Sequence, residues 1–359
     1  HQECDLEPGM GDIRNSVKRM AASALCGLQV DRLLRHIRRD RLVAVMYHGV
    51  TRNPHGPTPW TQIPEGVFAR QVEFLTENYN LLHLSDVVDH LQTGRDLPDG
   101  SALITFDDGL RNNLSVAFPI LAHYEAPAAI FVATDFIGTD RFYWFDELYL
   151  MMVADPAREQ VTSHLEQSIG RDLQALGPAE AYGLSVEHLK RVPQEELQEL
   201  MERLAGVATL ELEAFSDDYS VLDWPQIEQL QASGLVEFGV HTASHRILSS
   251  LEPAEWGREI RESRRQLSRA LGREAVAFAY PNGVPGIDYS EVHRSYLRES
   301  GYICAFNTDP RLVRLNAGTS FDIGRLPAGN DITSESPFFR LMCSGFPGLF
   351  GGSCRGLCI

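Results

Sequence analysis

The sequence is poor in cysteine and lysine and has no long hydrophobic run. Six cysteines among 359 residues are too few for a disulfide scaffold, and no CxxC pair supports a zinc knuckle. We therefore expect free thiols in a reducing compartment. No run of about 18 apolar residues occurs, so we expect no transmembrane helix. GxGxxG and GxxxxGKS/T are also absent, which argues against a nucleotide cofactor. The cysteines are Cys4, Cys26, Cys304, Cys343, Cys354 and Cys358.

Basic charge is scarce and unevenly spread. The chain has 32 Lys and Arg residues and 49 Asp and Glu residues, which gives a net charge of −17. A generic nucleic-acid-binding protein would show a basic footprint, so we expect no nucleic-acid partner. Residues 14–41 hold 8 bases and 2 acids, whereas residues 146–223 hold 17 acids and 5 bases. We interpret the first stretch as an N-terminal arm and the second as a solvated helical insert.

The arm spaces its apolar residues as a helix does, among arginines, between residues 13 and 37. Two interpretations fit this pattern. The helix lies on a membrane surface as a peripheral contact, or it packs against the folded domain. No convincing signal peptide is found. We therefore expect a cytoplasmic protein, with any peripheral contact at the inner face of the membrane.

The rest of the chain alternates short apolar runs with amphipathic stretches. This pattern predicts parallel strands joined by crossover helices. About seven such units favour an α/β fold, a distorted (β/α)7–8 TIM-like barrel, over a flat doubly wound sheet. We predict an arm at 1–41, a barrel domain at 42–335 with a helical insert at about 140–222, and a tail at 336–359. The apolar runs include residues 42–47, 102–106, 128–132, 236–240 and 275–279.

Polar residues directly follow four of the predicted strands. TFDDG covers residues 105–109, HTASH covers 241–245 and YPNG covers 280–283, while His48 follows the first strand. In parallel barrels the catalytic residues lie at the C-terminal ends of the strands. We therefore expect these four segments to meet at one face of the barrel.

The residue types in these segments suit a metal-dependent hydrolase. Two histidines four residues apart and a carboxylate at another strand end form a two-His, one-carboxylate site that leaves positions open for water. The second carboxylate of the DD pair can remain free as a base. Either motif alone is weak evidence. An aspartate at a strand end is often a helix cap, and a histidine is often simply hydrogen-bonded within the fold.

The order MYH, TFDDG, HTASH and YPNG resembles the polysaccharide deacetylases of carbohydrate esterase family 4, which share the NodB homology domain. The resemblance covers about Leu42 to Leu326, within the domain predicted at 42–335. It implies a divalent metal ion, with zinc preferred over other transition metals, and an acetylated glycan as substrate.

The resemblance also implies a role for each matching residue. Asp108, His241 and His245 match the metal ligands, and Asp107 matches the base that takes a proton from a water molecule on the metal. Tyr280 and Asn282 fall in the segment that contacts the substrate, where a backbone N–H near Asn282 would stabilise the oxyanion.

Two positions depart from the pattern of the family. Many members carry an arginine beside the base where this chain has Ala279, and Arg325 is the candidate replacement. Many members also carry a late histidine as the general acid, but here only His293 follows HTASH, in a predicted helix. His48 matches a branch that resembles biofilm poly-N-acetylglucosamine deacetylases and uses an early YH motif. The alternative is that His48 merely caps the loop after the first strand.

The leading functional hypothesis is therefore a hydrolase that removes N-acetyl groups from an amino-sugar polysaccharide, an oligosaccharide or a glycan precursor. Two alternatives remain open. One is a catalytically silent glycan-binding member of the fold, favoured by the missing arginine at position 279. The other keeps the metal site but hydrolyses an O-acetyl sugar or a cyclic amide.

Overall fold

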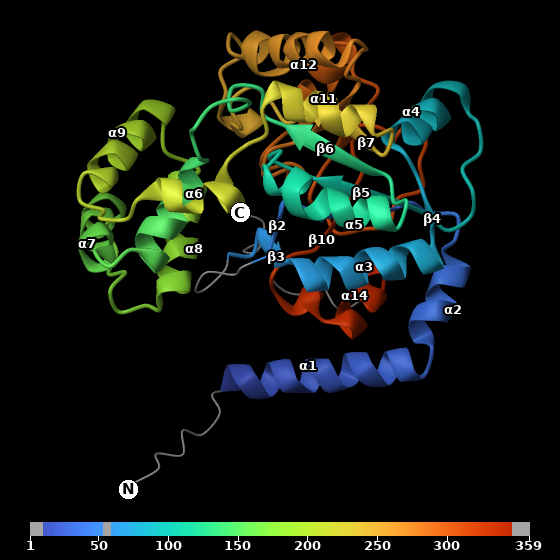
Figure 1. Ribbon diagram of the computed structural model, residues 1–359, viewed down its shortest axis with the longest axis horizontal. Helices are drawn as coiled ribbons and strands as arrows, with labels where there is room; N and C mark the ends of the chain where they lie inside the picture. The colour runs from blue at the N-terminus through green and yellow to red at the C-terminus, as the bar shows by residue number, and fades with distance from the viewer. Residues whose placement is uncertain (1–9, 53–58, 347–359) are drawn as a thin grey trace, which may run out of the picture.

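The computed structural model describes residues 10–52 and 59–346, and its centre is a curled parallel sheet (Figure 1). The seven strands on its main path follow the order β10-β1-β5-β6-β7-β8-β9, and every neighbouring pair is parallel. The predicted TIM-like α/β fold is thus confirmed. Cys4, Cys354 and Cys358 lie outside the described residues. The sheet contains β1 Val43–Tyr47, β4 Asn80–Leu81, β5 Ser101–Phe106, β6 Ala128–Val132, β7 Val236–Val240, β8 Ala277–Ala279, β9 Cys304–Phe306 and β10 Leu326–Pro327.

The two ends of the sheet are joined by the segment that leads into β10. Ile323 bridges to Phe306 at the end of β9, and Leu326 pairs with Val45 of β1. One stretch of chain therefore touches both edge strands and curls the sheet toward closure. It also carries Arg325 into the interior, where the side chain is fully buried.

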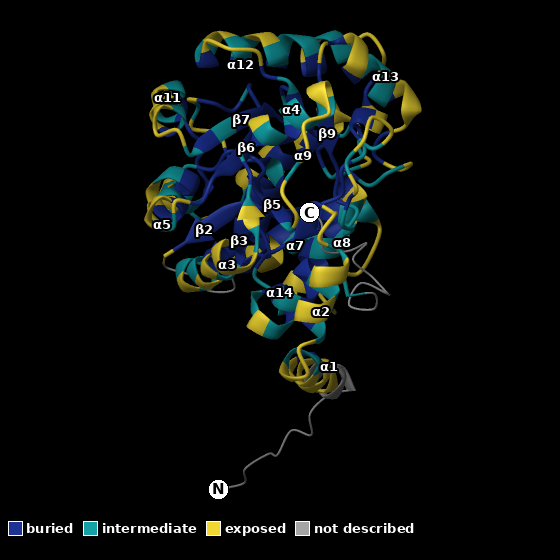
Figure 2. Ribbon diagram, turned by 90° about the vertical axis from the view of Figure 1, so that its right-hand side faces the viewer, coloured by how far each residue is buried: buried dark blue, intermediate teal, exposed yellow. Residues whose placement is uncertain are grey.

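Helices cover the outside of this sheet (Figures 1 and 2). The strands are apolar on both faces because one face lines the barrel interior and the other packs against helices. The outer elements are α3 Glu65–Asn78, α4 Leu84–Thr93, π-helix Asn113–Ala117, α5 Phe118–His123, α11 Trp224–Ala232, π-helix Gly257–Glu262, α12 Ser263–Leu271 and α13 Glu291–Glu299. Two of these helices, α5 and α12, each continue directly from a π-helix.

The acidic segment between β6 and β7 folds as a group of helices on one side of the barrel (Figure 1). It buries Leu165, Val186 and Leu204, and its apolar core is continuous with the barrel core. Each such side chain contributes roughly 1.5–3 kcal/mol when fully buried. The elements are α6 Trp144–Tyr149, π-helix Leu150–Ala154, α7 Arg158–Ile169, α8 Pro178–Leu189, α9 Gln194–Ala205, 3-10 helix Leu212–Phe215 and α10 Ser216–Tyr219.

Two parts of the chain differ from the sequence-based expectation. A small parallel sheet, β2 Gly49–Thr51 with β3 Gln62–Pro64, follows the first strand. The segment predicted as a tail begins instead with α14 Ser336–Cys343. This helix buries Phe338 and Leu341 because it lies between the barrel and the N-terminal arm.

The arm consists of two helices, α1 Met10–Gly27 and α2 Val30–Ile37. Ala22 of α1 packs against Phe338 and Leu341 of α14. Among the described residues, no helix is both long enough and apolar enough to cross a bilayer.

Candidate active site

The polar segments that follow β1, β5, β7 and β8 come together at the C-terminal ends of the strands. Their backbones are unusual. Six described residues other than glycine have positive φ, and four of these are Asp108, Thr242, His245 and Asn282. Non-glycine residues rarely adopt this conformation, and such strain concentrates at functional sites. Gly109 also has positive φ, and a Cβ there would lie 2.7 Å from Val132 Cγ1.

Asp108, His241 and His245 form one group of potential metal ligands. Asp108 Oδ1 lies 3.7 Å from His241 Nε2 and 3.1 Å from His245 Nε2. One donor atom from each residue falls within 4.8 Å of the others. Two imidazoles and a carboxylate, next to a cavity that leaves coordination positions open, match the donor set of a catalytic divalent-metal site.

The environment of the three side chains fits a bound cation. Asp108 Oδ1 is buried and accepts no hydrogen bond within the part of the chain that the structure describes. Such a group is costly unless something else pairs with it. His241 Nδ1 bonds the carbonyl of Ala279 at 2.8 Å, which leaves Nε2 to face the group. Burial lowers the pKa of His241 to about 4, so the imidazole is neutral at neutral pH, as a metal ligand must be.

Asp107 faces the same region and is held by Arg325. The guanidinium donates to both carboxylate oxygens, from Nη1 at 2.6 Å and from Nη2 at 2.7 Å. Burial alone would raise the pKa of Asp107, but the charge and hydrogen bonds of Arg325, together with His241 and His48, outweigh it, and the pKa lies below its usual value. The carboxylate is therefore ionised and fixed in orientation. Arg325, the residue predicted to replace the arginine expected where the chain has Ala279, thus lies beside Asp107.

We expect Arg325→Met to destabilise the fold by roughly 3–5 kcal/mol, because it leaves the charge of Asp107 buried without its partner. Urea unfolding of both proteins measures the difference. The matched control is Arg265→Met, which breaks the exposed ion pair with Glu262 and should cost no more than about 1 kcal/mol. Equal losses in the two variants would contradict a structural contribution specific to the buried pair.

His48 lines the same cavity as Asp107, His241 and His245. Its ring packs edge-on against Trp60, with the centroids 5.4 Å apart. Nδ1 is buried without a hydrogen-bond partner among the described residues. Burial lowers the pKa of His48 despite the nearby carboxylates. The imidazole is therefore placed to exchange a proton with a bound substrate, although its role stays a prediction.

The YPNG segment differs from the expectation for Tyr280. The hydroxyl donates to the carbonyl of Phe321 at 3.1 Å, the backbone N–H donates to Phe306, and the ring stacks on Tyr289. Both donors of Tyr280 are used within the fold, so its side chain supports the loop instead of contacting substrate. Asn282 does line the cavity, and no hydrogen bond among the described residues uses its backbone N–H.

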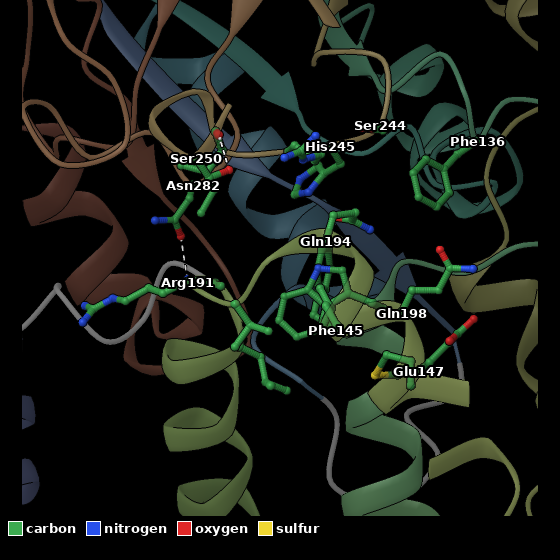
Figure 3. Close-up of a pocket in the computed structure, with 18 of the residues that line it drawn as sticks. Phe136, Phe145, Glu147, Arg191, Gln194, Gln198, Ser244, His245, Ser250 and Asn282 are labelled. Atoms are coloured by element: carbon green, nitrogen blue, oxygen red, sulfur yellow. Dashed lines mark hydrogen bonds between the residues drawn. The ribbon is translucent and has the colours of Figure 1, made fainter. Parts of the chain in front are cut away.

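The cavity next to these residues measures about 820 Å³, and the helical insert forms one wall of it (Figure 3). Figure 3 shows Phe145 and Gln194 from the insert on one side, with Ser244 and His245 on the other. The ring of Phe145 lies 5.3 Å from that of His245. Lys190 donates to Asn282 Oδ1 at 2.6 Å and thereby joins the insert to the YPNG loop. The volume accommodates a sugar unit and its neighbours.

Several residues that position the site were missed from the sequence. Glu259, buried on the π-helix before α12, accepts hydrogen bonds from the backbone N–H groups of Ala243 and Ser244. Tyr143 donates its hydroxyl to the carbonyl of Asp108 at 2.8 Å. The run of aromatics FYWF at residues 142–145 was an available signal, because such side chains so close after a strand end are placed to border the site. Nothing in the sequence marked Glu259.

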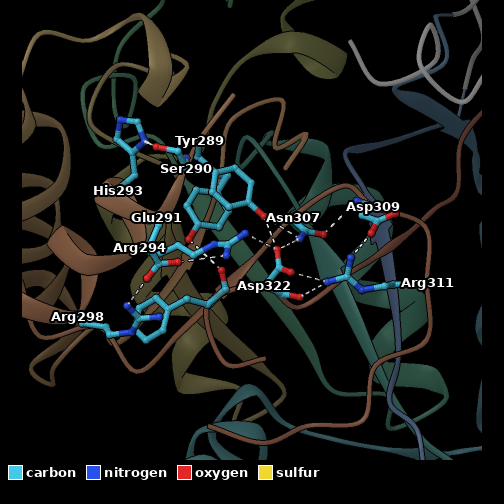
Figure 4. A network of polar contacts seen from close by, with 12 residues as sticks. Tyr289, Ser290, Glu291, His293, Arg294, Arg298, Asn307, Asp309, Arg311 and Asp322 are labelled. Atoms are coloured by element: carbon cyan, nitrogen blue, oxygen red, sulfur yellow. Dashed lines mark hydrogen bonds and ion pairs between the residues drawn. The ribbon is translucent and has the colours of Figure 1, made fainter. Parts of the chain in front are cut away.

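A polar network around Asn307 and Asp322 lies next to Arg325, and Figure 4 shows the network. Arg325 Nε donates to the carbonyl of Asn307 at 3.2 Å. The side chain of Asn307 donates to Tyr289 Oη at 2.8 Å and to Asp322 Oδ1 at 2.7 Å. His293 lies apart from the metal group, because its Nδ1 accepts from the N–H of Ser290 and caps α13.

Comparison with known proteins agrees with this geometry. The family model described as polysaccharide deacetylase matches residues 94–305, which is more than half of the chain. The match includes the DD pair, both histidines of HTASH and the YPNG segment. A search among curated proteins gives no match.

Solved structures with the same fold include the deacetylase PplD and the protein IcaB. PplD from Streptococcus pyogenes, solved with acetate, has a TM-score of 0.52 and 16% identity, and the alignment covers 86% of this chain and 99% of that one. IcaB from Ammonifex degensii has a TM-score of 0.54 and 20% identity, over 85% of this chain and 97% of its own. Identities this low establish a shared fold, while the family match identifies the kind of protein.

Proposed function

Because the chain belongs to the polysaccharide deacetylase family, we propose that it hydrolyses the N-acetyl groups of an amino-sugar polysaccharide, oligosaccharide or glycan precursor with the help of a divalent metal ion. One observation carries the proposal. Asp108, His241 and His245 converge beside an ionised Asp107, at the end of a cavity of about 820 Å³. We infer zinc as the preferred ion from the two imidazoles, since magnesium and calcium favour oxygen ligands.

These residues and their neighbours have separate roles in the proposed reaction. A cation held by the three ligands would polarise the acetyl carbonyl and make a water molecule more acidic. Asp107 takes the proton of the attacking water, and Arg325 holds its carboxylate in the orientation that this transfer needs. The backbone N–H of Asn282 donates to the oxyanion that forms on the former carbonyl oxygen. His48 gives a proton to the nitrogen of the sugar as the C–N bond breaks.

The lead alternative, a catalytically silent glycan-binding member, rested on the missing arginine at position 279. In the structure Arg325 donates two hydrogen bonds to Asp107. The missing arginine at position 279 therefore no longer argues for a silent site. Retention of the full donor set also favours a hydrolase over a binding module.

The decisive experiment measures acetate release from a panel of substrates, before and after treatment with a chelator. The panel contains N-acetylglucosamine oligomers, O-acetylated sugars and acetylated sugar nucleotides. We expect release from N-acetylated glycans, its loss with chelator and its return when zinc is added. Binding of the oligomers without acetate release would favour the silent module. Release from O-acetyl sugars alone would favour the ester hydrolase.

We expect His48→Ala to keep its metal and bind ligand but to lose most of its amide hydrolysis, by about 10²-fold or more. An amine is a poor leaving group that needs a proton, whereas an activated ester needs much less help. Kinetics on acetamide sugars and on an activated acetate ester, for the variant and for the wild type, test this expectation. A fall of the same size for both substrates would assign proton donation to another residue or to water.

A further inference from the structure

Large hydrophobic side chains gather on the outer surface of the N-terminal arm. Of the seven that are exposed among the described residues, five belong to this arm. Val17 is 60% and Met20 74% exposed on α1, and Leu28, in the turn directly after α1, is 76% exposed. On α2, Leu33 is 60% and Ile37 63% exposed. Isolated exposed apolar residues are ordinary, but a cluster on one element marks an interaction surface.

The spacing places the exposed apolar residues of α1, and Leu28 directly after it, on one stripe. Val17, Met20 and the exposed Ala21 and Ala24 stand at i, i+3, i+4 and i+7 of α1. Leu28, at i+11, is the first residue after the helix and continues its pattern, because its N–H donates to the carbonyl of Ala24. At 100° per residue they lie within about 50° of one line along α1. Such a stripe normally faces a protein core.

Here the core lies on the other side of the helix. Ala22 and Cys26 stand about 140–180° away from Val17 by the same geometry and pack toward Phe338 and Leu341 of α14. The arm is therefore already docked by one face, and the apolar stripe is a second face that nothing in the described structure covers. Figure 1 shows α1 at the lower margin of the molecule, outside α14, and Figure 2 shows most of its surface as exposed.

The docking of the arm is fixed by ion pairs as well as by apolar contacts. Asp31 of α2 is fully buried and pairs with Arg340 of α14, whose Nη2 lies 2.9 Å away. Arg19 of α1 pairs with Glu335 at 2.6 Å. These contacts join the arm to α14 and the segment before it, so the stripe is presented by the folded protein and not by a detached helix.

The charge beside the stripe is basic, in contrast to the rest of the chain. Residues 14–41 carry 8 bases and 2 acids, within a protein of net charge −17. Lys18 and Arg32 are exposed next to the apolar residues, and His36 lies between Leu33 and Ile37 on the exposed side of α2. An apolar stripe flanked by cations is the composition of a helix that lies in the plane of an anionic membrane.

We propose that α1 and α2 form a docking surface for an anionic phospholipid bilayer, with the stripe inserted at the boundary between headgroups and acyl chains. This proposal is independent of the catalytic site. A second copy of the chain is a poorer occupant, because pairing the stripe with itself would set the two basic flanks against each other.

The test uses the full purified chain and sedimentation with large unilamellar vesicles. One set is made of phosphatidylcholine, and the other of phosphatidylcholine mixed with phosphatidylglycerol. We expect binding to the anionic vesicles, weaker binding at high salt, and little binding to the neutral ones. The triple variant Met20→Glu/Leu28→Glu/Leu33→Glu should bind at least about tenfold more weakly. Equal binding of the two proteins, or equal binding to both vesicle sets, would overturn the proposal.

A matched control uses the two large hydrophobic residues outside the arm that are exposed in the described part of the chain. Ile287→Glu/Val292→Glu replaces side chains that are also well exposed and should bind anionic vesicles as the wild type does. Circular dichroism and thermal unfolding check that both variants are folded. Light scattering tests whether a second copy of the chain, and not a bilayer, covers the stripe. A wild-type dimer that the triple variant converts to monomer, without vesicle binding by either protein, assigns the stripe to a second copy and refutes the bilayer.

Discussion

Asp107→Asn is expected to retain its metal and to lose at least about 10²-fold in turnover. The asparagine has nearly the same shape as the aspartate, but its amide has no basic lone pair of comparable strength to accept the proton of the attacking water. Arg325 would then face a neutral group in place of the carboxylate that it contacts at 2.6 and 2.7 Å. The three candidate ligands do not include Asp107, so the metal content should remain one ion per chain.

The neighbouring aspartate supplies the matched control. Asp108→Asn removes the carboxylate whose Oδ1 lies 3.1 Å from His245 Nε2, so it should lose both the metal and the activity. Metal analysis of both purified variants, followed by acetate release at saturating metal, separates the two roles. Near-normal turnover in metal-loaded Asp107→Asn would refute the base. Loss of metal from Asp107→Asn would show that Asp107 is itself a ligand.

The parts of the site that adjoin a strand could be predicted from the sequence. Asp108, His241 and His245 each follow a short apolar run, and strands that are parallel deliver their ends to one face of the sheet. The strand over residues 128–132 and the strand over 236–240 have the predicted bounds. Local composition is informative there because a buried strand leaves few alternatives for its register.

The partner of Asp107 could be suggested but not placed from the sequence. Arg325 lies 218 residues away, and its approach depends on the segment before β10, which touches both β9 and β1. The pattern of the family only showed that an arginine was missing at Ala279. Which other arginine replaces it is decided by how the sheet curls, and no periodicity in the sequence reports that.

The cavity wall and the orientation of Tyr280 could not be predicted from the sequence. The apolar residues of α9 have helical spacing that indicates only a buried face, yet Leu197 and Met201 also border the cavity. A helix pattern does not reveal which partner its face will meet. Tyr280 stands in a matching motif, but its hydroxyl and N–H are used by Phe321 and Phe306. Motif identity does not reveal which side of a loop points into the site.

His241→Ala is expected to lower the metal affinity by more than about 100-fold. Removing a residue that only orients a metal ligand already lowers the affinity by about 10–100-fold, and His241 is itself a candidate ligand. Only Asp108 and His245 would remain, and two ligands do not fix a divalent ion in a tetrahedral site. Acetate release should fall with the bound metal. His293→Ala is the control, since His293 is also buried but caps α13 through Ser290, and it should keep the full stoichiometry.

Thermal unfolding gives a readout of this site that does not depend on catalysis. An ion that binds only the folded protein stabilises it by about 2.7 kcal/mol when present at 100 times its dissociation constant. Zinc should therefore raise the Tm of the wild type and of His293→Ala, and leave the Tm of His241→Ala unchanged. A bound ion would also pair with Asp108 Oδ1, which is buried and has no hydrogen-bond partner among the described residues, so the rise should disappear in Asp108→Asn as well. An equal rise in Tm for His241→Ala and the wild type would mean that the stabilising ion binds elsewhere and that these residues are not the metal site.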